Sequence, residues 1–557
     1  MIKKLERRLV TLKQQHDVML PLFQDVSEYI LPWIGQFIQS DSRRQLTSVQ
    51  TKNYRNIVDD AGTEAVQLLA AGIINDTMSP TTQWFGLAID GDNIGLDQAS
   101  KRWLDDAAKL IASVLVKSNV YQVCQSVIEV VAAFGTACAF IDDDNENIIR
   151  LHLFEPGEFY LATNSKGEVD SVYREFIMTV AQIVDAFGIE NTSERVRNAF
   201  NKGDLDQEVQ VRHAIEPRFD RDMNSKLAKD MPFKSVYWEY AGHNNKPLRE
   251  SGFKTFPCIA PRWDVFGNSA YGHCPGFRAL GTIKQLQFSQ IRKSEAIDYQ
   301  VRPPLTVPIS MKDRNNEYYP GGMSYYDPTA GSTGGVRTAY EVKVDLNALI
   351  EDIRDARDKI KKIFHSDLFT LITDVARQST AYEIAERKQE KVTLLGPVSR
   401  RLNLEMHTVI INTVFGRMFD AGLFPAPPDT LQGKVLKVEY KSALEDASKS
   451  QSLVAIERFL GMAANTAQIN PEALDKINID RIIDAYADGL GVDPDLAQDD
   501  EKVAMTRQAR AEAQAKQAQQ EQMLNMATAA GKVGNVPAEG NLLSEGMKNA
   551  GKAQLGQ

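Results

Sequence analysis

The chain has few of the residues on which metal centres and disulfide frameworks depend. It contains four cysteines and seven histidines among 557 residues. The cysteines, Cys124, Cys138, Cys258 and Cys274, form no C-x-x-C pair, and no two histidines stand at metal-ligand spacing. This scarcity predicts reduced thiols in the core or near the surface, and it argues against a disulfide framework or a metal site.

Motifs for nucleotide chemistry and covalent catalysis are missing as well. The patterns G-x-x-x-x-G-K-[ST], G-x-S-x-G, H-E-x-x-H and G-x-G-x-x-G do not occur. The acidic run Asp142-Asp143-Asp144 has no partnered acidic motif, so we interpret it as a solvated turn. We therefore predict no catalytic residue, no bound metal and no cofactor.

Long apolar runs and an excess of positive charge are also lacking. The most apolar segment, 127–141, is interrupted by Glu129 and Gly135, whereas a membrane span needs about 20 apolar residues. The basic N-terminus has no apolar stretch after it and is not a signal peptide. Because the net charge is -10, a protein whose main task is to grip DNA is disfavoured.

Hydrophobic periodicity predicts an α+β protein that is mainly helical. Residues 1–31 read as two helices, with Pro21 at a helix start and Pro32 as a stop. From Ile148 the period changes from helical spacing to alternation, which is typical of strands. Further helices are expected at 56–78 and 97–139, and strands at 85–89, 148–154, 159–162, 168–178, 208–215 and 235–241.

Two better-patterned helices follow, at 277–301 and 346–369. The second repeats Leu346, Leu349, Ile353 and Ala356 at an a/d-like spacing. By itself this pattern indicates an antiparallel helix pair packed on the body. The insert at 302–345 carries tyrosines on a Gly/Pro-rich frame, which favours a protein interface over an exposed loop. These tyrosines are Tyr318, Tyr319, Tyr325 and Tyr326.

The segment 376–425 is predicted as two long helical pieces. Pro397 removes a backbone donor, so we expect a kink or break near Leu395, and Gly422 suits the left-handed position after the second piece. A β run at 435–440 and more helices to about residue 490 follow. Residues 497–530 are helix-prone with few apolar anchors, and 531–557 read as a mobile tail.

Several short phrases occur in the order in which one known family has them. They are T-A-x-E-I-x-E-R (380–387), L-L-G-P, R-L-x-x-E (401–405), P-R-W (261–263) and Y-G-H-C-P-G (271–276), with I-L-P (30–32) and S-P-T-T-Q-W-F (79–85) before them. Over roughly residues 20–494 the chain resembles the portal, or head-to-tail connector, proteins of T7-like short-tailed phages. Cys274 stands where that family usually has glycine.

The resemblance implies a portal fold with wing, stem, clip and crown regions that assembles into a ring. The regions would be the following: 1–276 the wing, 277–301 and 346–369 the two stem helices, 302–345 the clip, 370–382 the tunnel loop, 383–424 the kinked helices that cross the wing, 425–496 wing and crown helices, and 497–557 the C-terminal helix and mobile tail.

The resemblance also implies a function. Portal rings, usually of twelve subunits, stand at one capsid vertex and carry double-stranded DNA in both directions. The implied partners are the terminase large subunit, a tail adaptor, scaffold and major capsid proteins, and no membrane. The protein would be made in the bacterial cytoplasm and reside in the virion. Candidate channel-lining residues are Lys284, Arg292, Lys293, Lys361 and Lys362, and the four tyrosines are candidate clip contacts.

Two other functions fit the same sequence. A capsid-associated scaffold or internal virion protein would keep the helical content but would not need the helix–insert–helix order. A nucleic-acid-processing enzyme would show nuclease or ATPase activity, for which the sequence offers no motif.

Overall fold

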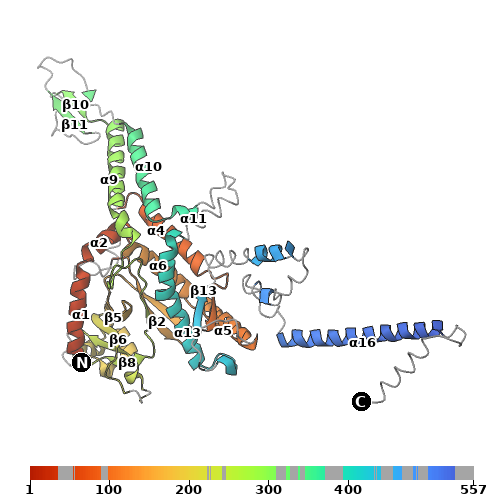
Figure 1. Ribbon diagram of the computed structural model, residues 1–557. Helices are drawn as coiled ribbons and strands as arrows, with labels where there is room; N and C mark the ends of the chain where they lie inside the picture. The colour runs from red at the N-terminus through yellow and green to blue at the C-terminus, as the bar shows by residue number, and fades with distance from the viewer. Residues whose placement is uncertain are drawn as a thin grey trace. The chain divides into compact units, whose positions relative to one another are not determined.

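A computed structural model gives the fold (Figure 1). It describes residues 1–35, 54–55, 57–89, 98–222, 225, 227–240, 246–308, 322–326, 337–338, 345–370, 393–431, 433, 436–440, 456–463, 465–466, 481–483, 486 and 500–533. The chain forms two compact units. The first consists of residues 1–96 and 103–448, and the second of residues 97–102 and 449–557.

The first unit contains a five-stranded antiparallel sheet covered by the N-terminal helix (Figure 1). Helix α1 (Ile2–Asp17) places Ile2, Leu5, Leu9 and Leu12 on one face, because leucines spaced by three and four residues share a side of a helix. That face packs on aromatic side chains of the sheet, including Trp238. The strands, in spatial order, are β4 (Phe159–Thr163), β5 (Val169–Thr179), β6 (Glu208–Pro217), β7 (Phe233–Glu239) and β8 (Arg249–Phe253).

Two short helices connect β5 to β6, where the sequence analysis named none. Helix α7 (Val180–Phe187) begins with a reciprocal capping box between Thr179 and Gln182, and α8 (Glu194–Lys202) begins at the N-cap Ser193. Their buried faces hold few residues each, so the helical period is repeated too briefly to stand out in the sequence.

Helices form the main core of the first unit. Helix α2 (Leu20–Tyr29) starts with a proline as predicted, and it packs with α4 (Ala61–Thr77) and α6 (Val120–Phe134). The helix predicted at 97–139 is instead two helices, α5 (Gln98–Lys117) and α6. Gly135, with a φ of 83°, ends α6 because a left-handed residue terminates a helix. Strand β2 (Cys138–Asp144) then pairs with β3 (Ile148–Phe154) and β9 (Cys258–Ile259).

The acidic run is part of this second sheet. Asp142, Asp143 and Asp144 lie at the end of strand β2 and not in a turn, so that part of the prediction was wrong. Arg417 holds Asp143 through an ion pair of 2.9 Å and donates to the carbonyls of Ile141 and Asp142. All four cysteines are buried, so of the two predicted locations the core is the correct one.

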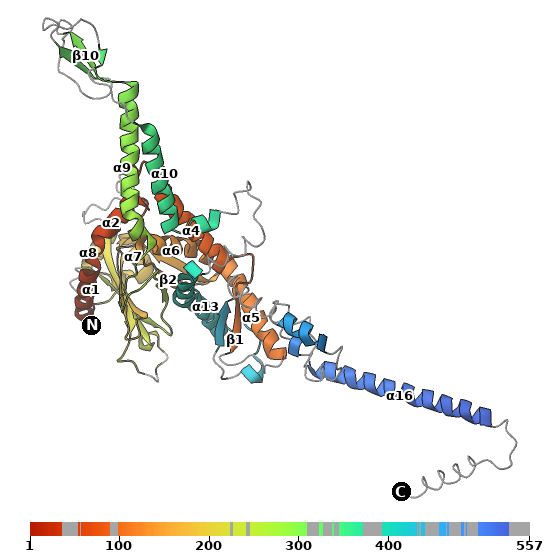
Figure 2. The same cartoon turned by 45° about the horizontal axis from the view of Figure 1, so that its top comes forward.

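Helices α9 (Pro275–Val301) and α10 (Leu346–Ile363) run side by side, as Figures 1 and 2 both show. A small sheet lies beyond them, formed by β10 (Leu305–Pro308), β11 (Met323–Tyr326) and β12 (Arg337–Thr338). The second helix was predicted to reach Phe369. It ends at Ile363 instead, because His365 adopts a positive φ of 53°, and a short helix α11 (Asp367–Thr370) follows.

A helix interrupted by a π-turn completes the first unit. Residues 393–402 are helical, the π-turn covers Asn403–His407, and α13 (Thr408–Asp420) continues to Gly422, whose φ of 67° confirms its predicted role. The break predicted near Leu395 is absent, since helix runs through Pro397; the irregular turn begins only at Asn403. Strand β13 (Leu436–Tyr440) pairs antiparallel with β1 (Phe85–Ile89).

The described part of the second unit is mostly one helix. Helix α16 (Asp500–Val533) spans the segment predicted as helix-prone, and nearly all of its described side chains are exposed. The predicted tunnel loop, the phrase at 380–387 and the tail at 534–557 lie outside the described residues, apart from residue 370. Among the described helices, none is long and apolar enough to cross a membrane.

Candidate functional site at the root of helix α9

The start of α9 presses against the end of α6 with backbone touching backbone. A Cβ built on Gly276 would lie 2.4 Å from the carbonyl oxygen of Ala133, and one on Gly135 would lie 2.2 Å from that of Gly272. Gly272 also donates its N–H to the Thr136 hydroxyl at 2.8 Å. These glycines therefore allow the close approach that sets where α9 leaves the body. We call residues 275–290 of α9 the root.

Cys274 is the N-cap residue of α9. Its Sγ donates to the Ala133 carbonyl at 3.2 Å, and the side chain is buried. Burial raises the pKa of the Cys274 thiol to about 12, so the thiol stays neutral and unreactive. The cysteine at this position therefore has a packing role.

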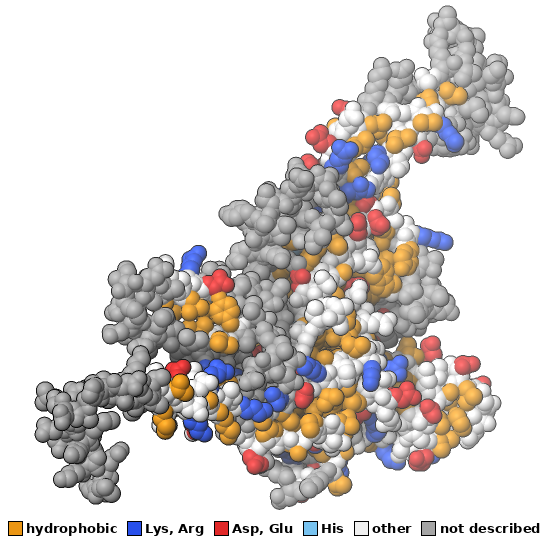
Figure 3. All heavy atoms as spheres, turned by 90° about the vertical axis from the view of Figure 1, so that its right-hand side faces the viewer, with side chains coloured by type: hydrophobic (Ala, Val, Ile, Leu, Met, Phe, Trp, Pro, Cys, Tyr) orange, Lys and Arg blue, Asp and Glu red, His pale blue; other side chains and the backbone are white. Residues whose placement is uncertain are grey.

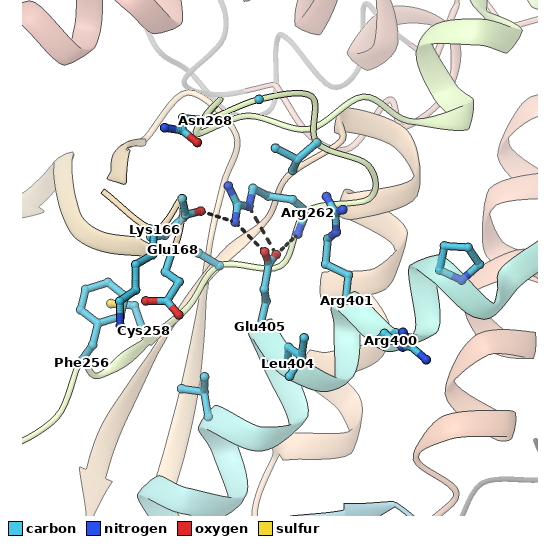
Figure 4. Close-up of a pocket in the computed structure, with 17 residues that line it drawn as sticks. Lys166, Glu168, Phe256, Cys258, Arg262, Asn268, Arg400, Arg401, Leu404 and Glu405 are labelled. Carbon is cyan, nitrogen blue, oxygen red and sulfur yellow. Dashed lines mark hydrogen bonds and ion pairs between the residues drawn. The ribbon is translucent and has the colours of Figure 1, made fainter. Parts of the chain in front are cut away.

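A charged pair joins two of the phrases that carried the family resemblance. Arg262 from P-R-W binds Glu405 from R-L-x-x-E through its backbone N–H (2.9 Å) and through Nη2 (2.6 Å). The same guanidinium donates to the carbonyl of Gly167 at 2.9 Å (Figure 4) and to the carbonyl of Ser269 at 2.9 Å. The Arg262 side chain is 5% exposed and that of Glu405 is 22% exposed. One arginine thus ties the loop before α9, the β4–β5 turn and the π-turn together.

A cavity of about 620 Å³ opens beside this pair. Lys166, Arg400 and Arg401 contribute positive charge to its lining, and Leu404 contributes an apolar side chain that is 63% exposed. The arginine and glutamate at the centre of this lining are bound to each other. Across the described residues, no group of three or more His, Cys, Asp or Glu could hold a metal ion.

A second polar cluster holds the root to the segment before α4. Asp59, whose side chain is 1% exposed, accepts from Arg357 of α10 (2.8 Å) and from Gln290 of α9 (2.7 Å). Gln287 accepts from the N–H groups of Val58 and Asp59 and donates to the Asp59 carbonyl. Burial raises the pKa of Asp59, but these donors outweigh it and hold the pKa below its usual value. Both long helices are therefore fixed through one carboxylate.

The π-turn is supported by aromatic and hydroxyl groups. The carbonyl of Asn403 accepts the helical bond from the N–H of Thr408, and it also accepts from the hydroxyls of Thr408 (2.8 Å) and Tyr440 (2.9 Å). His407 is fully buried with its ring 5.2 Å from that of Trp84, a residue of the S-P-T-T-Q-W-F phrase. Burial lowers the pKa of His407 to about 3, so this ring is neutral. These contacts fix the π-turn and thereby the position of Glu405.

The predicted channel-lining cations lie on both long helices. Lys284 binds Asp25 of α2 at 2.8 Å, and Arg292 stacks over Phe288 of its own helix. Lys361 and Lys362 are exposed near the end of α10, and Lys293 is partly buried on α9. The structure does not bring the five together into one cluster, and their role stays a prediction.

Two of the four predicted clip tyrosines lie among the described residues. Tyr325 and Tyr326 lie on β11, parallel to β10, whereas Tyr318 and Tyr319 fall outside the described residues. Their role as contacts also stays a prediction.

Residues 2–497 match the model of the family described as bacteriophage head to tail connecting protein. The chain is 39% identical to the "Probable portal protein" of Bordetella phage BPP-1 over 543 residues, or 96% of this chain and 97% of that one. It is 36% identical to the "Portal protein" of Salmonella phage epsilon15 over 530 residues, or 95% and 94%. A chain in the solved virion of a gene transfer agent particle aligns over 71% of this chain and 85% of its own at 10% identity and a TM-score of 0.33, too low to support a conclusion.

The chain belongs to the bacteriophage head-to-tail connecting protein family. The resemblance found in the sequence is thereby confirmed, and so is the portal role. This family is defined by a structural connection and not by a reaction.

Proposed function

We propose that the chain forms a ring at one vertex of the capsid and that double-stranded DNA passes through the ring during packaging and ejection. In this proposal α9 and α10 form the stem around the channel, and residues 302–345 form the clip at its end. The sheets and helices of the body form the wing, and about twelve copies complete the ring, which is a closed cyclic arrangement.

The observation that carries the proposal is the way two long helices are rooted in the body. Helix α9 has 27 residues and would extend about 40 Å, yet only its root is buried. Three separate phrases of the family meet around that root, at Gly276, Arg262 and Glu405. A ring needs the helix pair at the same angle in every copy, and these contacts fix that angle.

The partners follow from the same proposal. The terminase large subunit would dock on the clip during packaging and a tail adaptor afterwards, while scaffold and major capsid proteins would surround the wing. The net charge of -10 per chain suits a conduit, because a ring of many strong phosphate contacts would retain DNA and stop it sliding.

The test is the mass and symmetry of the purified full-length protein, measured by native mass spectrometry and negative-stain averaging. We expect a closed ring of about twelve subunits with a central hole. A monomer that forms no ring when concentrated would overturn the proposal and favour an internal structural protein.

The clip is tested separately, by deleting residues 310–340. The deletion is expected to leave the ring intact and to abolish binding of the terminase large subunit. Unchanged binding would contradict the clip assignment. We also expect neither ATPase nor nuclease activity from the purified ring.

A further inference from the structure

Where the root ends, helix α9 exposes an apolar surface on the side away from the body. Phe288 is 58% exposed and Ile291 is 43% exposed, while the guanidinium carbon of Arg292 lies 4.8 Å above the Phe288 ring. Phe288 stands two residues from both Leu286 and Gln290, which are buried, so it points about 200° away from them around the helix. We call the surface of Phe288, Ile291 and Arg292 the back of α9.

Helix α10 has a back of opposite charge. Its buried residues are Ile353, Ala356 and Ile360. Glu351 and Asp355 each stand two residues from Ile353, again about 200° around the helix, and both are exposed beside Ile350, which is 39% exposed. Among the described residues, neither Glu351 nor Asp355 has an ion-pair partner. Figure 3 shows hydrophobic side chains exposed among charged ones along this helix pair.

The two backs lie at the same height along the pair. The Ser289 hydroxyl donates to the Asp352 carboxylate at 3.4 Å, so Phe288 and Arg292 of α9 are level with Glu351 and its neighbours on α10. The helices face each other through their buried sides, which leaves the two backs on opposite flanks of the pair. Within one chain, therefore, Arg292 cannot reach Glu351.

We propose that the back of α9 packs on the back of α10 of the next copy in the ring, with Arg292 bound to Glu351 and Phe288 against Ile350. This inference rests on the proposed ring. Rotation about a ring axis places the same residue of every copy at the same height along that axis. Because the two backs are at equal height within one chain, the back of α9 in one copy is at the height of the back of α10 in the next copy when the stem runs along the axis. In this arrangement the apolar side chains of Phe288 and Ile350 pack together, and the positive charge of Arg292 lies against the negative charge of Glu351.

The assignment removes Arg292 from the set of predicted channel-lining residues. Within its own helix Arg292 lies 3.6 Å from Glu295, and an exposed pair of this kind is weak enough to give way to a partner across the interface. An arginine that stacks on Phe288 and binds a neighbouring carboxylate is held in the wall between subunits. The sides of the helix pair that lie between the two backs would then face the channel.

The experiment uses two charge reversals, R292E and E351R, in the full-length protein. In a ring made only of R292E copies, two acidic side chains face each other at every interface; in one made only of E351R copies, two basic side chains do. We expect each variant alone to lose rings at least tenfold in native mass spectra. An equimolar mixture should recover rings containing equal numbers of both chains, because alternating copies restore an opposite pair at each interface.

Several controls make the outcome decisive. Both residues are exposed, so circular dichroism should match wild type, and K361E, about 80° from Glu351 around the same helix, should keep its rings. F288S, which changes no charge, should also lower the ring fraction.

Three results would overturn the inference and leave the ring itself standing. They are wild-type amounts of ring from either reversal, a mixture that recovers no rings, and an equal loss of rings in K361E. A wild-type chain without rings would instead overturn the proposed function.

Discussion

The root of α9 and the half beyond it belong to one helix but depend on different partners. Every buried residue of α9 lies between Pro275 and Gln290, and none of residues 291–301 is buried. The root is held by glycine contacts, an Arg–Glu pair at its entry and the Asp59 cluster. The far half carries exposed apolar side chains, although a helix in water gains most of its stability from packing one face. The root is stabilised by its own chain, whereas we propose that a neighbouring chain covers the exposed apolar side chains of the far half.

The largest effect expected from this difference comes from a methyl group at the root. G276A places a Cβ 2.4 Å from a carbonyl oxygen of α6, against backbone that cannot swing aside. We expect a loss of about 3 kcal/mol in the free energy of unfolding, measured by urea titration. G281A, on the same helix with nothing within 4 Å, is the matched control and should gain about 0.5 to 1 kcal/mol. Equal changes in the free energy of unfolding for G276A and G281A would show that the close backbone contact at Gly276 does not stabilise the root.

Neutralising Glu405 is expected to cost somewhat less. E405Q leaves Arg262 without its charged partner in a site where the arginine is 5% exposed. Breaking a fully buried pair costs about 3 to 5 kcal/mol, and because the carboxylate is partly exposed we expect about 2 kcal/mol. The exposed pair Lys254–Asp420 is the comparison, and D420N should cost less than about 0.5 kcal/mol. Similar losses would show that Arg262 is not dependent on Glu405.

Lowering the pH should reduce the free energy of unfolding, because burial keeps His407 neutral in the folded protein. Its pKa falls from an ordinary value of 6.5 to about 3 in the folded protein, so the unfolded chain takes up the proton first as the pH drops. Stability is therefore complete above pH 6.5 and declines below it, by about 1.4 kcal/mol at pH 5.5. H407F keeps a ring against Trp84 and should remove this contribution. Urea titrations of both proteins at pH 7.5 and 5.5 measure it, and identical acid losses would exclude His407 as the cause.

The smallest effect is expected on the exposed back of α9. F288S removes a side chain that is already 58% exposed, so the free energy of unfolding of the isolated chain should change by less than about 0.5 kcal/mol. A loss comparable to that of G276A would mean that Phe288 has a partner within its own chain.

Periodicity predicted the elements well wherever a pattern extended over several turns or several alternations. The a/d-like spacing of α10 is confirmed, with Ile353, Ala356 and Ile360 buried, and β1 and β3 begin and end as predicted. Ile291 and Ile297 of α9 are apolar but exposed, because the body no longer reaches that part of the helix. Periodicity reports where apolar residues recur and not what lies against them.

The site was predicted only as a set of phrases. P-R-W and R-L-x-x-E were recognised as family features, but nothing in either indicates that Arg262 and Glu405 bind each other across 143 positions. Asp59, Gln287, Gln290 and Arg357 were missed entirely, since single polar residues in a helix or loop look the same whether they face water or a buried partner. The π-turn gave no signal, because it inserts one residue without interrupting the apolar pattern around it.

The sequence by itself determined most of the described helices and strands, the absence of the common catalytic motifs and, through the order of its phrases, the portal family, because propensity, periodicity and short motifs are local properties. Only the tertiary structure decided which glycines press against another backbone, which carboxylate holds both long helices, and which apolar side chains of α9 remain uncovered. Those properties depend on contacts between residues far apart in the chain, where packing and charge pairing are settled.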